Sequence, residues 1–477
     1  MSDKLKLAIV GASGFVGSHL IDYLRENRKE YDIVALSRSA PAAQDVEHRP
    51  CDLFSLLDIE NGLDDCDVAI YLVHSMAPSA HLDQGDFKDY DLIVVDNFLR
   101  ACKKKSIKQI IYLGGITPKD KQKLSDHLDS RLEVEDFIKS SLIPVTVFRA
   151  GMIMGLGGSS FNIMLNLIKR LPVLGLPKWT KTETQPVHID HVVECISESI
   201  AIEEHYFKTY ELANCDILTY EEMLRITAQE LDIKRKFVYL PWINRKLSKF
   251  WISMISGAPR SLVFPLVEGL NHRIVADPKL EFKKTKNDFV DSLKKSLHSK
   301  EITKAFTPHA FKKGKRKKNY EVRSVQRLNL PRGMRAIDVA YEYMNWLPLY
   351  LRFFIRVSVK DENIKFMLWP FGITLLVLEL SPKRSSADRQ LFYVTSGVLS
   401  RKTKRGRLEF REVLGGKYII SAIHEFKPSL PWMIYRFTQA PIHLRVMNAF
   451  GRWLTIINKR NIAKDRTRSK ITQSSDI

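Results

Sequence analysis

The stretch that most constrains the fold is LAIVGASGFVGSHL, residues 7–20, near the start of the chain. An apolar run leads into three glycines spaced by three, Gly11, Gly14 and Gly17, and a segment with helical periodicity follows. Such glycines allow a tight turn, a close approach of a diphosphate to the backbone and close packing of helix on strand. The stretch therefore predicts a nucleotide site. Its expected residues are Gly11, Ala12, Ser13, Gly14, Phe15, Val16 and Gly17.

Strand and helix patterns alternate through the first part of the chain. Apolar strand-like runs occur at 33–36, 68–73, 109–113 and 145–148, and segments with helical periodicity separate them. This alternation predicts the α/β class, with a doubly wound parallel Rossmann sheet and a substrate lobe within residues 1–300. Ligands of such sheets bind at the carboxyl ends of the strands. Contacts are accordingly expected from Leu72, Val73 and His74.

Residues after the second strand indicate which nucleotide binds. Ser37, Arg38 and Ser39 stand where an acidic residue favours a free ribose 2′-hydroxyl and an arginine favours a 2′-phosphate. Arg38 therefore favours NADP over NAD, although an exposed loop arginine is the simpler alternative.

The G-x-x-G-x-x-G spacing resembles that of atypical and extended short-chain dehydrogenases/reductases, a group that includes NmrA-like and epimerase-like proteins. The resemblance implies that Asp52, with Leu53, lies near the adenine of the cofactor. Members of the family carry Y-x-x-S-K on a later helix, where the tyrosine protonates a carbonyl and the lysine binds the nicotinamide ribose. In the corresponding segment, HLDSRLEVE, His127 replaces the tyrosine and Arg131 replaces the lysine.

His127 and Arg131 keep the spacing of the family's tyrosine and lysine, although both side chains differ chemically. His127 and Arg131 are four residues apart and share one face of a helix. Arginine can hydrogen-bond ribose hydroxyls, and histidine titrates near neutrality and can act as a general acid. Three interpretations stay open: an NADP-dependent oxidoreductase that uses both residues, a non-catalytic NADP-binding sensor or assembly factor, and a charged helix face.

The substrate is less well indicated. The resemblance places a carbonyl-polarising serine where this chain has Gly114 and Gly115, and the nearest hydroxyl is that of Thr117. Ser75, Thr117 and Met152 are candidate substrate contacts. The apolar, aromatic stretch 240–270 favours a hydrophobic small molecule, with core packing as the alternative.

Two histidines raise the question of a metal site. The three-residue spacing of His188 and His191 does not by itself form a metal-binding motif, so no metal site is expected. Asp190, between them, is predicted to be the N-cap of a helix.

The second half is predicted to be a separate α+β domain over residues 320–458, after a basic linker at 301–319. A strand over 320–328, a helix over 335–357 and a closing helix over 441–457 surround four strand-like runs at 373–380, 391–399, 407–413 and 417–426. This is the order of helix-grip lipid-binding folds. The tail, 459–477, is basic, polar and predicted to be disordered. The chain resembles bacterial proteins in which an atypical short-chain dehydrogenase is fused to a further C-terminal domain.

Charge and cysteine usage restrict partners and compartment. The net charge of +21 fits plain solubility or peripheral contact with an anionic membrane through Lys312 to Lys318, and a membrane-surface lipid-binding scaffold is a further alternative. No sequence signature of a nucleic-acid-binding module accompanies the charge, so nucleic acid is not expected. Five scattered cysteines without metal spacing, and a start without a signal-peptide pattern, favour the cytoplasm.

Overall fold

The computed structural model describes residues 4–43, 45–73, 82–118, 124–241, 252–253, 260–298, 321–351, 354–360, 362–401 and 405–475. The chain divides into two compact units, and each is described by itself. The N-terminal unit comprises Met1–Ala77 and Val94–Gly314, and the C-terminal unit comprises Pro78–Ile93 and Lys315–Ile477. His74, Ser75 and the basic run 312–318 lie outside the described residues.

The N-terminal unit is built on a seven-stranded sheet in the order β12-β7-β6-β4-β1-β2-β3, and every pairing in it is parallel. This confirms the α/β class and the doubly wound Rossmann sheet. The strand order reverses between β1 and β4, where such sheets bind their ligands. The strands are β1 (Leu5–Val10), β2 (Tyr31–Ser37), β3 (Glu47–Pro50), β4 (Val68–Tyr71), β6 (Gln109–Gly115), β7 (Val145–Ala150) and β12 (Thr209–Leu212).

Helices explain why the central strands are apolar along their whole length. On one face, Leu20 and Leu24 of α1 and Val192 and Ile196 of α6 pack in one core with the sheet. Elsewhere Phe98 of α3 lies 4.7 Å from Tyr71, between ring centroids. Parallel strands buried on both faces require near-continuous apolar runs. These helices are α1 (Phe15–Asn27), α2 (Leu56–Gly62), α3 (Phe87–Lys104), α4 (Asp126–Lys139) and α6 (Ile189–Glu198).

One predicted helix boundary is wrong. The N-cap of α6 is His188, whose ring nitrogen accepts the Asp190 backbone N–H at 3.3 Å, and Asp190 lies inside the first turn. An imidazole nitrogen is a less common N-cap acceptor than a carboxylate, which is why the sequence pointed two residues further on.

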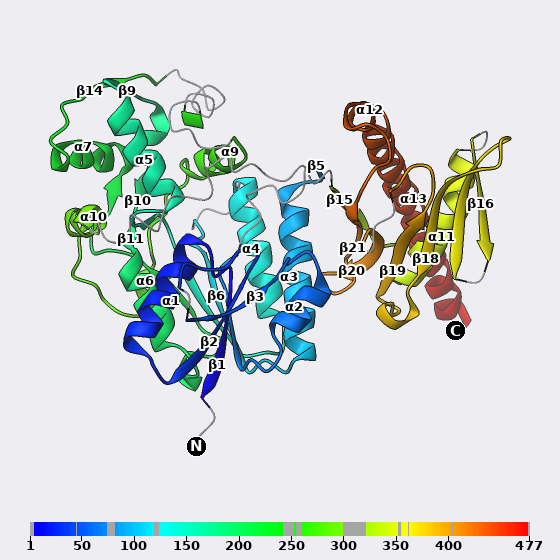
Figure 1. Cartoon of the computed structure of the whole chain (residues 1–477), viewed down its shortest axis with the longest axis horizontal. Helices are drawn as coiled ribbons and strands as arrows, with labels where there is room; N and C mark the ends of the chain where they lie inside the picture. Colours follow the sequence, from blue (N-terminus) through cyan, green and yellow to red (C-terminus); the bar gives the residue numbers. More distant parts are fainter. Residues whose placement is uncertain are drawn as a thin grey trace. The chain divides into compact units, whose positions relative to one another are not determined.

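A lobe with its own apolar core, formed by residues such as Phe161, Leu165, Met223 and Phe289, adjoins the Rossmann sheet and is drawn in green in Figure 1. Short paired strands connect its helices. Its elements are β8 (Ile153–Met154), α5 (Ser159–Arg170), β9 (Val173–Leu176), β10 (Glu183–Thr184), β11 (Val187–His188), β13 (Leu218–Thr219), α7 (Tyr220–Glu230), β14 (Lys236–Tyr239), α9 (Arg260–Gly269) and α10 (Phe289–His298).

The C-terminal unit contains an eight-stranded sheet in the order β16-β17-β18-β19-β20-β21-β15-β5. Its first seven strands pair antiparallel, and β5, from the early segment 78–93, adds to β15 in parallel. The strands are β5 (Leu82–Gln84), β15 (Val322–Asn329), β16 (Ile355–Lys360), β17 (Asn363–Leu368), β18 (Ile373–Leu380), β19 (Arg389–Ser396), β20 (Arg407–Val413) and β21 (Tyr418–Phe426).

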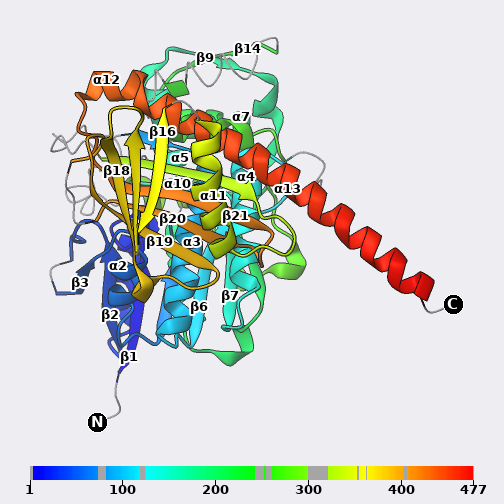
Figure 2. The ribbon, with the colours of Figure 1, turned by 90° about the vertical axis from the view of Figure 1, so that its right-hand side faces the viewer.

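Two long helices cover one face of this sheet, as Figure 2 shows. Tyr343 of α11 (Ala336–Tyr350) lies 5.0 Å from Phe450 of α13 (Gln439–Ser475) and 5.4 Å from Phe410 of β20, between ring centroids. A short helix, α12 (Trp432–Phe437), precedes α13. The predicted combination of an antiparallel sheet with a long C-terminal helix is confirmed.

The structure differs from the sequence expectation at two places in this unit. Residues 355–360 and 363–368 form a hairpin, β16 and β17, where the predicted helix extended to 357. Helix α13 continues to Ser475, through the segment predicted to be disordered. No glycine or proline occurs after residue 451, so nothing in the sequence interrupts the helix.

No helix in the described ranges is both long and apolar enough to cross a bilayer.

Candidate functional site

The glycine turn after β1 has the geometry that its sequence requires. Gly11 has a φ of +95°, in the region that favours glycine, and its N–H donates to the carbonyl of Leu36 at 2.9 Å. A Cβ on Gly17 would stand 2.4 Å from the carbonyl oxygen of Gly11, so only glycine lets α1 pack this closely on the turn. Both positions are therefore closed to larger residues.

The N-terminus of α1 points free amides toward the end of β1. Gly14 is its N-cap, and no described side chain caps it. The first amides of a helix lack intrahelical partners, and together with the helix dipole they favour a phosphate. Ala12, Ser13, Phe15 and Val16 belong to the same turn or first helical turn. The predicted phosphate-binding residues thus form one continuous backbone surface.

The residues that were predicted to select the nucleotide follow β2. Ser37 is buried, and its hydroxyl donates to the carbonyl of Ser39 at 2.7 Å, so it shapes this loop. The side chain of Arg38 is exposed. Arg38 is therefore the cation of this segment that can reach a ligand from the loop.

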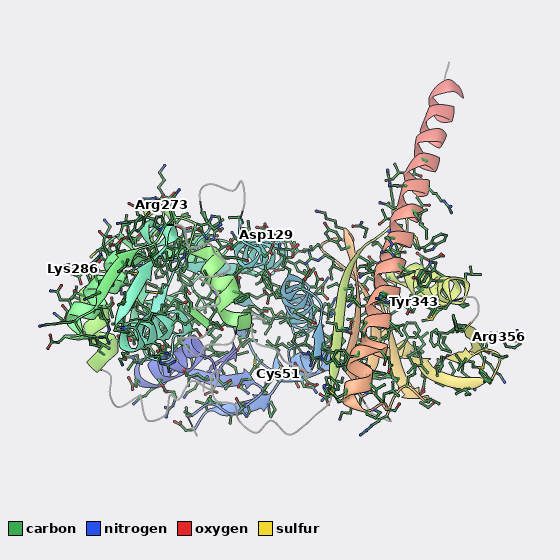
Figure 3. The ribbon with its side chains drawn as sticks, turned by 90° about the horizontal axis from the view of Figure 1, so that it is seen from above. Cys51, Asp129, Arg273, Lys286, Tyr343 and Arg356 are labelled. Carbon is green, nitrogen blue, oxygen red and sulfur yellow. The ribbon has the colours of Figure 1, made fainter. Side chains whose placement is uncertain are left out.

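Asp52 and Leu53 lie on the neighbouring turn after β3. The Asp52 carboxylate accepts the backbone N–H of Phe54 at 3.2 Å. The fully buried Asn97 of α3 donates to the carbonyl of Leu53 at 2.9 Å and so fixes the turn. The backbone of this turn is also held against the end of β2, because the N–H of Cys51 donates to the carbonyl of Ser37 at 3.1 Å. Cys51 is labelled in Figure 3.

Leu72 and Val73 follow β4 and lie against the glycine turn. Leu72 donates its N–H to the carbonyl of Val10 at 3.0 Å, and a Cβ on Gly11 would come within 2.8 Å of a Val73 methyl group. Of the strand-end residues that were predicted here, these two therefore lie beside the phosphate turn.

Helix α4 carries His127, which was predicted to protonate the substrate, and Arg131, which was predicted to bind the nicotinamide ribose. Its N-cap, Ser125, accepts the N–H of Leu128 at 3.4 Å. Burial, and secondarily the charge of Arg131, lowers the pKa of His127 from its usual value to about 3. The electrostatic effect requires the two side chains to lie near each other, as their spacing predicted. His127 is therefore a neutral imidazole at physiological pH.

Arg131 lies where α4 meets the sheet. The hydroxyl of the fully buried Tyr112, on β6, donates to the Arg131 carbonyl at 3.4 Å. Ser130, beside it, is buried. The helix face that carries the pair thus rests on the strand whose carboxyl end holds Gly114 and Gly115.

A buried ion-pair network one turn further along α4 was missed by the sequence analysis. Arg149 of β7 lies 2.7 Å from Glu135 and 3.3 Å from Glu211 of β12. Burial alone would raise the pKa of Glu135, but hydrogen bonds from Arg149 and Lys139 outweigh it and lower that pKa. The network fixes α4 on the sheet.

The strand end of β6 and the start of the lobe complete the site. Thr117 and Met152 are half-buried, after β6 and β7 respectively. The next segment approaches the glycine turn closely, because a Cβ on Gly155 would come within 2.8 Å of the Phe15 ring. The clustered glycines at 155–158 were the sequence signal for this contact. The lobe therefore begins directly against the phosphate turn.

No group of three or more His, Cys, Asp or Glu side chains in the described part of the chain could hold a metal ion. His188 instead contacts Asp190 at 3.2 Å in the α6 cap.

The switch point, the glycine turn and the uncapped helix together define a dinucleotide-binding Rossmann unit. Residues 7–132 match the NAD dependent epimerase/dehydratase family. This segment is therefore similar to that family of NAD(P)-binding Rossmann proteins.

Individual proteins are more distantly similar. Sanguinarine reductase of Eschscholzia californica is 22% identical over 254 residues, which is 45% of this chain and 90% of that protein. Auxiliary protein GraX of Staphylococcus aureus is 28% identical over 114 residues, 24% of this chain and 37% of its own length. The chain thus spans little more than a third of GraX.

A similar solved structure is that of an NADPH-dependent quinone oxidoreductase of Escherichia coli in complex with NADPH. It has a TM-score of 0.49 and 18% identity, and the match covers 61% of this chain and 99% of the other.

Proposed function

We propose that the N-terminal unit is an NADPH-dependent oxidoreductase that transfers a hydride between the nicotinamide and a carbonyl, iminium or alkene group of an apolar substrate. The observation that carries the proposal is the position of the His127 and Arg131 pair. It lies on the helix that packs against β6, two strands from the phosphate turn, with the spacing of the family's tyrosine and lysine.

The residues fit the dinucleotide. Gly11, Gly14 and Gly17 would hold its diphosphate through backbone amides, Arg38 its 2′-phosphate, and Arg131 the nicotinamide ribose. The nicotinamide supplies the hydride, and the protein supplies binding, orientation and electrostatics.

His127 acts in this proposal as a neutral hydrogen-bond donor. With a pKa of about 3, its imidazole carries no positive charge at neutral pH. A neutral imidazole N–H can still polarise a carbonyl oxygen as negative charge develops on it. In this proposal His127 would take the carbonyl contact that the family gives to the serine, which is missing at Gly114 and Gly115, while Arg131 would hold the nicotinamide ribose.

The first experiment measures NADPH oxidation by the purified full chain, with sanguinarine as the first substrate because a similar protein is named for that activity. A panel of apolar aldehydes, ketones and enones follows. His127→Phe should lower kcat by about a hundredfold and leave the Kd for NADPH within a factor of about two. Equal losses in kcat and NADPH binding would contradict the role of His127.

A reversal variant sharpens this test. His127→Tyr combined with Arg131→Lys restores the pair that the family uses, so it should retain turnover that His127→Phe loses. A double variant as inactive as His127→Phe, with NADPH still bound, would count against hydride transfer at this position.

Arg38 tests the choice of nucleotide. Arg38→Ala should weaken NADPH binding by about tenfold to a hundredfold and leave NADH binding unchanged, because a charge-assisted contact to the 2′-phosphate is lost. Arg28→Ala, which removes another arginine of the same unit, is the matched control. Parallel losses for both nucleotides would show that Arg38 does not read the 2′-phosphate.

A non-catalytic NADP-binding sensor or assembly factor is the second candidate. The observation that favours it is that the site lacks an imidazolium, since the pKa of His127 is far below neutrality. This candidate predicts NADPH binding at normal affinity with no oxidation across the whole panel, in the wild type and in the reversal variant alike.

A further inference from the structure

Large apolar side chains are exposed together at one end of the C-terminal sheet. Phe371 is 74% exposed and Phe354 is 63% exposed, and Tyr350, Trp369, Ile373 and Val398 are exposed as well. We call these six residues the apolar end. Isolated exposed apolar residues are ordinary, but a contiguous group marks an interaction surface.

The backbone brings these six residues together from four segments. Helix α11 ends at Tyr350, and Phe354 directly precedes β16. The N–H of Trp369 donates to the carbonyl of Phe354 at 2.9 Å, which joins this segment to the β17–β18 turn. The N–H of Val398 donates to Thr374 at 3.1 Å and so lies beside Ile373.

The apolar end consists of residues in turns, at the start of strand β18 and at the end of helix α11. Exposed apolar residues of helix α12 form a second group beside it. Strand register places the end of β17, the start of β18 and the end of β21 at the same edge of the sheet. Helix α12 follows β21 there, and Met433, Ile434 and Phe437 on it are exposed. Side chains on such projecting elements can enter a bilayer interface without burying the sheet itself.

Positive charge surrounds the same end. The Arg356 guanidinium, labelled in Figure 3, lies 3.4 Å from the centroid of the Trp369 ring. Arg436 lies on α12, and Arg401 and Arg405 lie in the described parts of the connection between β19 and β20. Glu321 and Glu425, two carboxylates at this end, lie 3.2 Å from Lys427 and 3.3 Å from Arg405. The basic residues around the apolar end thus complement an anionic surface.

We propose that the apolar end docks the protein peripherally on a lipid bilayer with anionic headgroups. Aromatic residues favour the boundary between headgroups and acyl chains, and each nearby cation adds attraction to anionic lipid. Apolar insertion and charge are both needed for stable attachment without a membrane-spanning helix.

The test measures binding of the full chain to sedimented vesicles, with pure phosphatidylcholine compared with vesicles that contain about one third phosphatidylglycerol. Wild type should bind the anionic vesicles, and added salt should weaken that binding. Phe354→Ser combined with Phe371→Ser should reduce it by at least about tenfold, because two apolar anchors are lost. Phe207→Ser, which replaces a phenylalanine that is 66% exposed in the N-terminal unit, is the matched control and should not reduce it.

The charge contribution has its own pair of variants. Arg401→Gln with Arg436→Gln should weaken binding to anionic vesicles by about tenfold at low salt. Lys234→Gln with Lys286→Gln removes two exposed cations from the N-terminal unit and should have no such effect.

Several results would overturn the proposal. Binding that is the same for both vesicle types, or an equal loss in Phe207→Ser and in the double phenylalanine variant, would do so. Self-association of the wild type that the double variant abolishes, without vesicle binding, would assign the surface to a protein interface. NADPH binding and circular dichroism establish that each variant is folded, so the outcome is independent of whether the chain turns over any substrate.

Discussion

The two sheets of this chain differ in which residues occupy their central strands and their strand ends. In the N-terminal unit the central strands are apolar, and glycines such as Gly11 and Gly115 occupy strand ends. In the C-terminal unit charged residues such as Glu409 and Arg411 lie buried within strands, and large apolar residues such as Phe371 are exposed at the ends.

The difference follows from what covers each sheet. A parallel sheet with helices on both faces requires mostly apolar central strands, and its ligand approaches the backbone at the strand ends. An antiparallel sheet alternates between two faces, and here the face opposite α11 and α13 carries Arg389, Glu409 and Arg411. In each unit the candidate site therefore lies at strand ends, built from small residues in one and from large residues in the other.

The largest expected effect tests the role of small residues. Gly17→Val places a Cβ 2.4 Å from the Gly11 carbonyl oxygen and should weaken NADPH binding by more than about a hundredfold in a fluorescence titration. Gly115→Ala is the matched control, because a Cβ there meets nothing within 4 Å. Vesicle binding should be unaffected in both variants. An NADPH affinity equal to that of wild type in Gly17→Val would remove the basis of the comparison.

The next effect concerns buried charge. Burial alone would raise the pKa of Glu409, but Arg389 and Arg411 hold it well below its usual range. Glu409→Gln leaves both guanidiniums without that charge and should lower the free energy of unfolding by about 3 kcal/mol in urea titrations. Glu379→Gln, on exposed β18 surface, should change it by less than about 0.5 kcal/mol. A similar change in unfolding free energy for both variants would mean that the ion pairs of Glu409 with Arg389 and Arg411 contribute no specific stability.

The geometry of the glycine turn and the helical spacing of His127 and Arg131 could be predicted because their sequence signals are local. Three glycines in one turn, and His127 four residues before Arg131, specify their own geometry. The alternating pattern of IRVSVK, residues 355–360, also indicates a strand, but its place directly after an apolar helix hid it. Strand β5 could not have been predicted, since three residues carry no periodicity and their partner, β15, lies more than two hundred residues away.

What the sequence could not provide was solvent exposure. Phe354 lies in a segment predicted to be helical and Phe371 in an apolar stretch, and only the fold shows that both are exposed in turns. In the same way, the ordinary pKa of histidine predicted a titrating His127, whereas burial makes it a neutral group.

The smallest effect uses one buried histidine in each unit. Burial lowers the pKa of His443 on α13 to about 4, and burial together with Arg131 lowers that of His127 to about 3. The unfolded chain, in which histidine has a pKa of about 6.5, binds a proton that the folded chain does not bind, so stability falls as the pH drops below about 6.5. Between about pH 7.5 and 5.5 each group should cost about 1 kcal/mol.

Replacing either residue by phenylalanine should therefore reduce the loss of unfolding free energy between these pH values by about 1 kcal/mol. His272→Phe is the control for removing a histidine elsewhere in the chain. Urea titrations at both pH values measure this loss. Because the two histidines lie in different units, equal flattening by His127→Phe and His443→Phe means that both units unfold in one transition. Flattening of only one transition by each variant means that the units unfold separately, and an unchanged slope in both would show that neither imidazole is neutral in the folded protein.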